Sequence, residues 1–274
     1  MLAKLSNIVG DRMRRQRQQL LALVILAVGA VGDAAAELSL DFGIESFRWR
    51  EFDAGAQLLE ETGPRFRAGA TWRRPFGAEQ RDELQARGSF YIGNVDYDGQ
   101  ACTLSGSCTP FQTNADYYGA TGEALYLRRL GDAQIGEFFA GGGIDIWRRD
   151  IQGSGNVSGA IEDWTVFYVA VGGGARWSGS ATRYHVQAGA KYPFYTTNVP
   201  NSFDVILEPK GRVSPFARFT IDFVSGGRPR WGVGLYYDSY RFDTSDVERI
   251  GSIQIFQPES RQDLFGIFTS VYLR

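Results

Sequence analysis

Long runs in which apolar and polar residues alternate are the feature of this sequence that most constrains its fold. In the stretch PRFRAGATWRR (64–74), even-numbered residues such as Phe66 and Trp72 are apolar, whereas Arg65 and Arg67 stand at odd-numbered positions. A β-strand places alternate residues on opposite faces. In a soluble sheet the apolar face would pack on a core and the arginines would meet water. In a membrane barrel the apolar face would meet lipid and the arginines would line the lumen.

About ten such runs follow the first 36 residues. Each is longer than the usual soluble strand of about 5–6 residues and long enough for a tilted membrane strand, which needs about 9–11 residues. An even number of strands, with no amphipathic helix after residue 37, favours an all-β fold: a transmembrane, antiparallel, up-and-down β-barrel of about ten strands. The predicted strands lie near residues 38–52, 62–74, 83–97, 116–129, 135–149, 163–177, 182–196, 211–224, 230–243 and 262–273.

The connections between these runs alternate in length, as periplasmic turns and extracellular loops do in outer-membrane barrels. Both ends of the barrel chain are then expected on the periplasmic side. The short connections lie near 75–82, 130–134, 178–181 and 225–229, and the longer ones lie near 53–61, 98–115, 150–162, 197–210 and 244–261.

The N-terminal segment, residues 1–36, has the three parts of a secretory signal peptide. A cluster of arginines precedes the apolar run 20–31, and the alanines at 34–36 offer a small-residue cleavage site. The apolar run is shorter than the about 20 residues of a membrane helix, so an N-terminal anchor is the less favoured alternative. We therefore expect a signal peptide at 1–36 and a barrel domain at 37–274, in the outer membrane of a Gram-negative bacterium.

Composition agrees with an exported, β-rich chain. The sequence contains 34 glycines and 14% aromatic residues, and its formal net charge of −2 makes no case for nucleic-acid binding. The glycine runs 141–143 and 172–174 lie inside predicted strands, where they leave room for a bend or a bulky neighbour. A phosphate-binding loop would need a following helix. We expect no cofactor and a monomeric protein.

The polar faces of the predicted strands carry charges of both signs. A ten-stranded interior is narrow, and buried charges are stable only when they are paired and hydrogen-bonded. We therefore expect a largely filled lumen with an arginine–carboxylate network; an open water path, as in a small porin-like channel, is the alternative. The predicted inward charges are Arg65, Arg67, Arg87, Glu137, Asp145, Lys191, Arg218 and Asp222, with Glu45, Glu123 and Asp238 as further acids.

Four tryptophans fall near the predicted strand ends. Trp72, Trp164, Trp177 and Trp231 stand where interfacial aromatic girdles occur in membrane barrels. Ordinary packing against neighbouring strands is the alternative for some of them.

The only two cysteines, Cys102 and Cys108, fall in the predicted long loop 98–115. Two nearby cysteines in an exported chain indicate one disulfide. Such a bond would pin a surface loop rather than build the fold. A metal site is the weaker alternative, because no histidine is near.

An acidic pair, Asp96 and Asp98, stands at the outward end of the third predicted strand. Residues two apart point to the same side of a strand. The two carboxylates could share a proton or hold a water, or bind a cation, although the remaining ligands of a calcium loop are missing. A polar strand end is the simplest interpretation.

Ten strands, a similar length and this Asp-x-Asp pair resemble the omptins, the surface proteases of the outer membrane. The resemblance implies a ten-stranded barrel and an active site in which the pair faces an Asp–His dyad from the fourth long loop. That loop offers Asp204 here, but Ile206 stands two residues on, where the dyad needs histidine. The single histidine, His185, is predicted to lie in the lumen far from the loops, so the general base of the reaction is missing.

The sequence thus favours a non-enzymatic outer-membrane barrel that acts structurally or binds ligands through its outer loops. The expected partners are outer-membrane lipid and lipopolysaccharide, with divalent cations at the acidic loops. A small channel is the first alternative, and an omptin-like protease or another outer-membrane hydrolase is a distant one. Segments such as WRRDIQG and YYDSYRF also resemble small proteobacterial outer-membrane barrel proteins of unassigned function.

Overall fold

The computed structural model describes residues 36–102, 108–131, 135–251 and 253–273, and the predicted signal peptide lies almost wholly outside them. No helix in these ranges is long and apolar enough to cross a membrane. The elements are β1 (Glu37–Asp53), β2 (Ala56–Phe76), η1 (Ala78–Gln80, a 3-10 turn), β3 (Asp82–Cys102), β4 (Cys108–Leu130), β5 (Gly136–Ile151), β6 (Ala160–Ser178), β7 (Thr182–Pro200), β8 (Lys210–Arg212), β9 (Ser214–Ser225), β10 (Arg228–Asp243), β11 (Glu248–Ile250), β12 (Ile253–Ile255) and β13 (Glu259–Leu273).

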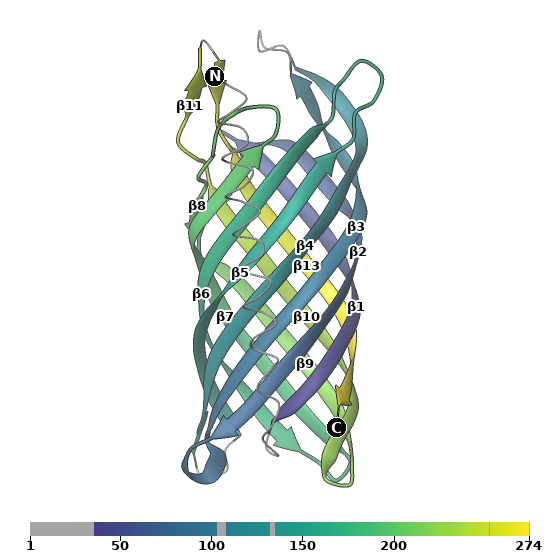
Figure 1. Ribbon diagram of the computed structural model, residues 1–274, viewed down its shortest axis with the longest axis vertical. Coiled ribbons are helices and arrows are strands. Elements are labelled where there is room, and N and C mark those ends of the chain that lie inside the picture. Colours follow the sequence, from purple (N-terminus) through teal and green to yellow (C-terminus); the bar gives the residue numbers. More distant parts are fainter. Residues whose placement is uncertain (1–35, 103–107, 132–134, 252, 274) are drawn as a thin grey trace, which may run out of the picture. The chain divides into compact units, whose positions relative to one another are not determined.

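The strands form one closed antiparallel barrel (Figure 1). Strands β1 to β7 pair in chain order, β7 pairs with β9 and β9 with β10, and β13 pairs with both β10 and β1, which closes the sheet. Strands β8 and β9 are separated only by Val213 and both pair with β10, so together they occupy one of ten positions. Closure satisfies the backbone hydrogen bonds that an open sheet edge would leave exposed. The predicted all-β, up-and-down barrel is confirmed.

The barrel has two distinct ends. At the end that we call the terminal end, Leu38 lies opposite Leu273, so the first and last strands meet there. At the other end, which we call the hairpin end, β3 and β4 run on as a paired ladder to Cys102 and Cys108. A further small hairpin, β11 with β12, lies within the predicted 244–261 connection.

Two of the predicted loops are paired strand instead. The connection expected near 53–61 is a two-residue turn, Ala54 and Gly55, both with positive φ. The acidic pair Asp96 and Asp98, expected at the edge of a loop, belongs to the β3 ladder. The error has a physical reason: beyond the apolar zone the outer face becomes polar, so the alternating pattern fades while the backbone pairing continues.

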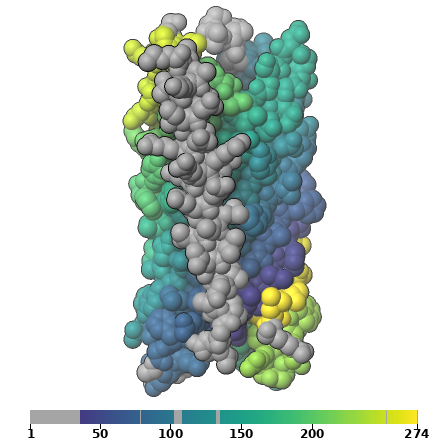
Figure 2. Space-filling model, viewed as in Figure 1, coloured from purple at the N-terminus to yellow at the C-terminus, as the bar shows by residue number. Residues whose placement is uncertain are grey.

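The outer face of the barrel carries a broad apolar belt. Phe66, Phe90, Ile92 and Val171 are each about 61–62% exposed although they are large and apolar. Such a continuous exposed apolar surface far exceeds what a monomeric soluble protein shows. It matches the lipid-facing band of a membrane barrel. Figure 2 shows the outward side chains of the strands in a space-filling view, coloured along the sequence.

Aromatic side chains line the terminal end of this belt, as predicted. The rings of Trp177 and Tyr184 stack with centroids 5.4 Å apart, and those of Phe223 and Trp231 stack at 3.9 Å. Trp164 does not belong to a girdle: it is 1% exposed and lies on the inner face of β6. Its even number decides this, because the outward residues of β6 are the odd ones.

A charge placed in the belt should be far more costly than one at its edge. Val171 and Thr165 share the outer face of β6, Val171 within the belt and Thr165 next to the charged residue Asp163. We expect Val171→Arg to lower the free energy of unfolding in lipid vesicles by about 2–4 kcal/mol and Thr165→Arg by about 0–1 kcal/mol. Urea unfolding followed by tryptophan fluorescence measures both, and equal costs would contradict the assigned belt.

Candidate functional site in the barrel lumen

The inner face of the barrel is densely charged. Arg65, Lys191, Glu137, Asp145 and Asp222 are each 5% exposed or less. Arg67, Arg87 and Arg218 lie on the same inner face and are partly exposed within the lumen. All eight charges that the alternation assigned to the lumen therefore stand on the inward side of their strands.

Arg65 anchors the middle of the network. Its Nε donates to Glu45 Oε1 at 2.7 Å, and its guanidinium lies 4.5 Å from the ring of Phe47 and 4.2 Å from that of Tyr91. The Tyr91 hydroxyl in turn donates to Asp145 at 2.8 Å. A planar cation held by a carboxylate and by two aromatic faces fills the lumen without needing water.

Other cations of the middle layer are held in the same way. The Lys191 ammonium lies 2.6 Å from Asp238 Oδ1 and 3.6 Å from the ring centroid of Tyr240. The Arg87 guanidinium donates to Glu123 at 3.2 Å and to Gln187 at 2.8 Å. Each of these two cations thus has a carboxylate partner, which is the arrangement that makes their burial tolerable.

A second layer closes the lumen toward the terminal end. The Arg176 guanidinium donates to both oxygens of Glu83, at 2.7 and 2.9 Å. His185 Nε2 lies 2.6 Å from Glu137 Oε1, and Gln187 donates to that same oxygen at 3.0 Å. The single histidine is therefore part of a buried polar layer.

A cavity of about 110 Å³ remains within the middle layer, beside the Arg87 and Lys191 side chains. Arg67, Arg87, Arg218, Asp41 and Asp238 are among the residues that line it. Its polar lining and its size suit a few ordered water molecules. Side chains therefore surround this small polar chamber.

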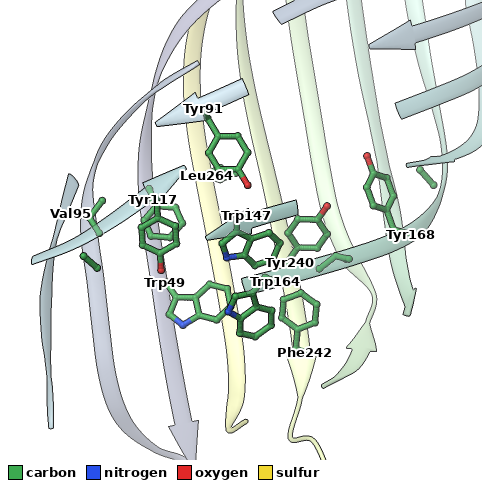
Figure 3. Close-up of a cluster of buried hydrophobic side chains, with 14 of the residues drawn as sticks. Trp49, Tyr91, Val95, Tyr117, Trp147, Trp164, Tyr168, Tyr240, Phe242 and Leu264 are labelled. Carbon is green, nitrogen blue, oxygen red and sulfur yellow. The ribbon is translucent and has the colours of Figure 1, made fainter. Parts of the chain in front are cut away.

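Aromatic rings gather in the lumen on the hairpin-end side of this chamber, and Figure 3 shows how they cluster. We call Trp49, Trp147, Trp164, Tyr240 and Phe242 the aromatic plug; they come from β1, β5, β6 and β10 and are at most 5% exposed. Trp147 and Trp164 stack at 5.3 Å, and Trp49 meets Trp164 edge-on at 5.1 Å. Close ring packing of this kind excludes water from between the rings.

One buried arginine, Arg149, holds the plug from above. Its Nη1 donates to Glu51 at 2.9 Å and to Glu162 at 3.0 Å, while its Nη2 donates to Glu61 at 2.8 Å. The same three carboxylates take further hydrogen bonds: Trp49 Nε1 donates to Glu51 and Trp164 Nε1 to Glu162, both at 2.9 Å, and the Tyr117 hydroxyl donates to Glu61. A single guanidinium therefore organises three strands and two indoles.

This cluster lies above the apolar belt, because the outward neighbours of Arg149 are the charged residues Arg148 and Asp150. Burial raises the pKa of the Glu51 and Glu61 carboxyls above their ordinary value of 4.5, although the Arg149 guanidinium acts in the opposite direction. Three carboxylates facing one cation carry excess negative charge, so proton binding relieves the cluster.

The alternation did not identify the plug or Arg149 as a unit. Their inward facing follows from residue parity alone: Trp49 and Arg149 share the odd-numbered inner faces of β1 and β5. Parity cannot predict that Arg149 contacts Glu51, because the two residues are 98 positions apart in the chain.

Asp96 and Asp98 lie on the outer face of β3, away from the lumen. They help to line an open cleft of about 770 Å³ beside the upper ends of β2 and β3, together with Glu60, Gln100 and Gln112. His185 lies near the start of β7, by the terminal end. The pair and the histidine are therefore at opposite ends of the barrel, and they form no dyad.

Cys102 lies directly opposite Cys108 across the β3–β4 ladder. Opposed positions in neighbouring strands bring side chains close enough to interact. This register is compatible with the disulfide that the sequence predicts.

Removing the Arg149 charge should be strongly destabilising. Arg149→Met leaves three carboxylates around a buried site without their cation, which costs about 3–5 kcal/mol. The neighbouring Arg148 faces outward, is 31% exposed and pairs with Asp163, so Arg148→Met is the matched control and should cost at most about 1 kcal/mol. Urea unfolding in vesicles measures both, and similar losses for the two variants would contradict the assigned role of Arg149.

The cluster should also make stability depend on pH through Glu61. Because the pKa of Glu61 is higher in the folded protein than in the unfolded chain, the folded state holds more protons between the two values, and its free energy of unfolding falls as pH rises through that window. Glu61→Gln cannot ionise, so we expect the stability of this variant relative to the parent to increase as pH rises above 4.5, the ordinary pKa of glutamate.

Glu60→Gln is the control, since Glu60 faces outward and pairs with exposed Arg48. The midpoints of urea unfolding, measured across the pH range for the parent and for both variants, test this prediction. Parallel profiles for Glu61→Gln and the parent would refute the prediction.

No protein-family model matches the chain, and neither does any curated protein. Among solved structures, the outer membrane protease OmpT from Escherichia coli is 9% identical, with 89% of this chain and 99% of that one covered and a TM-score of 0.48. The translocator domain of the autotransporter NalP from Neisseria meningitidis is 10% identical, with coverages of 93% and 95% and a TM-score of 0.42. An outer membrane channel from Pseudomonas putida F1 is 12% identical, with coverages of 89% and 97% and a TM-score of 0.40. All three are outer-membrane barrels with different roles, and at these TM-scores the likeness carries no argument about function.

Proposed function

We propose that this protein is a sealed outer-membrane barrel of a Gram-negative bacterium that acts through its outward surface rather than as a permanent pore. The observation that carries the proposal is the aromatic plug beneath the Arg149 cluster, which closes a lumen already filled with ion pairs. The apolar belt supports the membrane location. The hairpin end then faces outside and the terminal end faces the periplasm.

The outward surface offers a binding site in the cleft beside β2 and β3. Its lining combines carboxylates (Glu60, Asp96 and Asp98) with side-chain amides (Gln100 and Gln112). Its volume of about 770 Å³ falls within the range of ligand pockets. Carboxylates and amides suit a hydroxyl-rich or cationic ligand, and a Cys102–Cys108 disulfide would stiffen the hairpin that forms one wall.

Lipopolysaccharide and divalent cations are the partners that the outer rim fits. Among the described residues, no group of three or more His, Cys, Asp or Glu is placed to hold a metal ion alone. A divalent cation at the rim would therefore be shared between carboxylates such as Asp96 and the phosphates of neighbouring lipid.

A gated channel is the second candidate, because the polar chamber of about 110 Å³ lies directly below the plug. In that case the plug is the gate. The sealed barrel is favoured because the plug is packed ring against ring and is tied to buried carboxylates.

Conductance in a planar bilayer tests the proposal. The refolded parent, with folding checked by its heat-dependent gel mobility, should give no steady unitary steps. Trp49→Ala combined with Trp164→Ala removes two plug rings and should raise conductance to measurable steps. Trp177→Ala, a tryptophan of the outer girdle, is the matched control and should stay silent. Steady steps from the parent would overturn the sealed barrel and establish the channel.

A further inference from the structure

We infer that a row of four arginines on the outer face binds the phosphate of an anionic lipid headgroup. Arg212, Arg241, Arg261 and Arg50 are opposed in turn across β8, β10, β13 and β1. We call these four residues the arginine row. The inference rests on the proposed membrane location and names the lipid chemistry that this surface recognises.

The height of the row matches the headgroup region of a bilayer. On β13, the belt residues Phe265 and Ile267 are 55% and 51% exposed on the outer face. Arg261 shares that face and lies further along the strand toward the hairpin end. With a rise of about 3.4 Å per residue and a strand tilt of about 40°, the row stands roughly 10 Å above Phe265. Phosphates of a lipid monolayer lie within a few ångströms of the edge of the hydrocarbon core.

The row has more cationic charge than its carboxylate partners neutralise. Asp263 lies 2.9 Å from Arg50 and 2.5 Å from Arg241. Glu259 lies 2.7 Å from Arg261 and 3.5 Å from Arg212, and Asp243 lies 3.2 Å from Arg212. Three carboxylates thus share four guanidiniums, each of which has five N–H donors.

The unused donors face outward where a headgroup can reach them. The side chains of Arg212 and Arg261 are 48% and 42% exposed. Guanidinium groups bind phosphate in a bidentate manner and with charge assistance. Arg241 has a second task, because it also donates to the backbone carbonyls of Tyr240 and Gln262. Arg212 and Arg261 are therefore the residues whose donors are most available to a ligand.

The rest of the rim would repel the same ligand. At the same height, the outer faces of β2 to β6 are mainly acidic, with Arg148 as a cation that is already paired with Asp163. The acidic residues there are Glu60, Asp96, Asp98, Asp116, Asp150 and Asp163. Charge is segregated around the rim, so an anionic headgroup has one favourable place to bind.

Native mass spectrometry of the full barrel in detergent tests the inference with two lipids of identical acyl chains. Phosphatidic acid carries a phosphate monoester, whereas the phosphate of phosphatidylcholine is neutralised by its choline. We expect one bound phosphatidic acid at an occupancy at least about tenfold above that of phosphatidylcholine, which corresponds to about 1.4 kcal/mol. Arg212→Gln combined with Arg261→Gln should abolish this preference. Arg148→Gln, which removes an arginine of equal height across the barrel, should keep it.

Several outcomes would overturn the inference. These are equal binding of the two lipids, an unchanged preference in the double variant, or displacement of the lipid by millimolar inorganic phosphate, which would indicate a site for free anions. Dimers that the double variant abolishes would instead assign the row to the acidic rim of a second copy.

Measuring insertion into vesicles distinguishes failure of this inference from failure of the proposed function. A barrel that inserts and stays silent in a bilayer but shows no lipid preference contradicts the arginine row alone. A barrel that does not insert contradicts the membrane location itself.

Discussion

The narrow interior of a ten-position barrel is the constraint on which the rest of this structure depends. An interior of this size lies between the filled eight-stranded barrels and the wide porins. Inward polar groups therefore meet one another rather than bulk water. The pairing of Arg65 with Glu45 and the two-oxygen contact of Arg176 with Glu83 are the consequences. The first pair joins the neighbouring strands β1 and β2, whereas the second joins β6 to β3, so the network in the lumen also braces the barrel.

Arg149 connects the buried ion pairs of the lumen to the aromatic plug. A lone arginine among Glu51, Glu61 and Glu162 would be a poor source of stability if the carboxylates had no other task. Here two of these acids also hold the indoles of Trp49 and Trp164. The charged cluster therefore positions the aromatic plug, and the plug in turn shields the cluster from the chamber below. The polar and aromatic layers therefore depend on each other at this height.

The side-chain composition of the outer surface changes along the length of the barrel. An apolar belt is flanked by stacked aromatics at the terminal end and by charges at the hairpin end. The charges at the hairpin end are not mixed evenly: arginines gather where the first and last strands meet, and carboxylates gather on β2 to β6. Such segregation means that different sides of one rim present different chemistry to the same layer of lipid headgroups.

The sequence by itself determined which way each side chain points. A strand has a period of two, so the facing of Arg65, Lys191 or Asp222 is a local property that alternation displays, and so is the lipid-facing belt. Where the outer face turned polar, as around Glu60 and Asp96, the pattern no longer marked the strand, and loops were predicted in place of paired ladder. Trp164 does not belong to a girdle although it stands near a strand end, because its even number places it on the inner face of β6.

Only the tertiary structure decided which inward and outward groups meet. Closure of β13 on β1 brings Arg50 beside Arg261, and the curvature of the wall brings Trp49 against Trp147 and Trp164. The meeting of Arg149 with Glu51 and Glu61 depends on the register of several strand pairs at once. These contacts join residues far apart in the chain, and no local pattern carries that information. The face on which a side chain lies is set by its position in the strand, whereas the residues that it contacts are set by strand register and barrel closure.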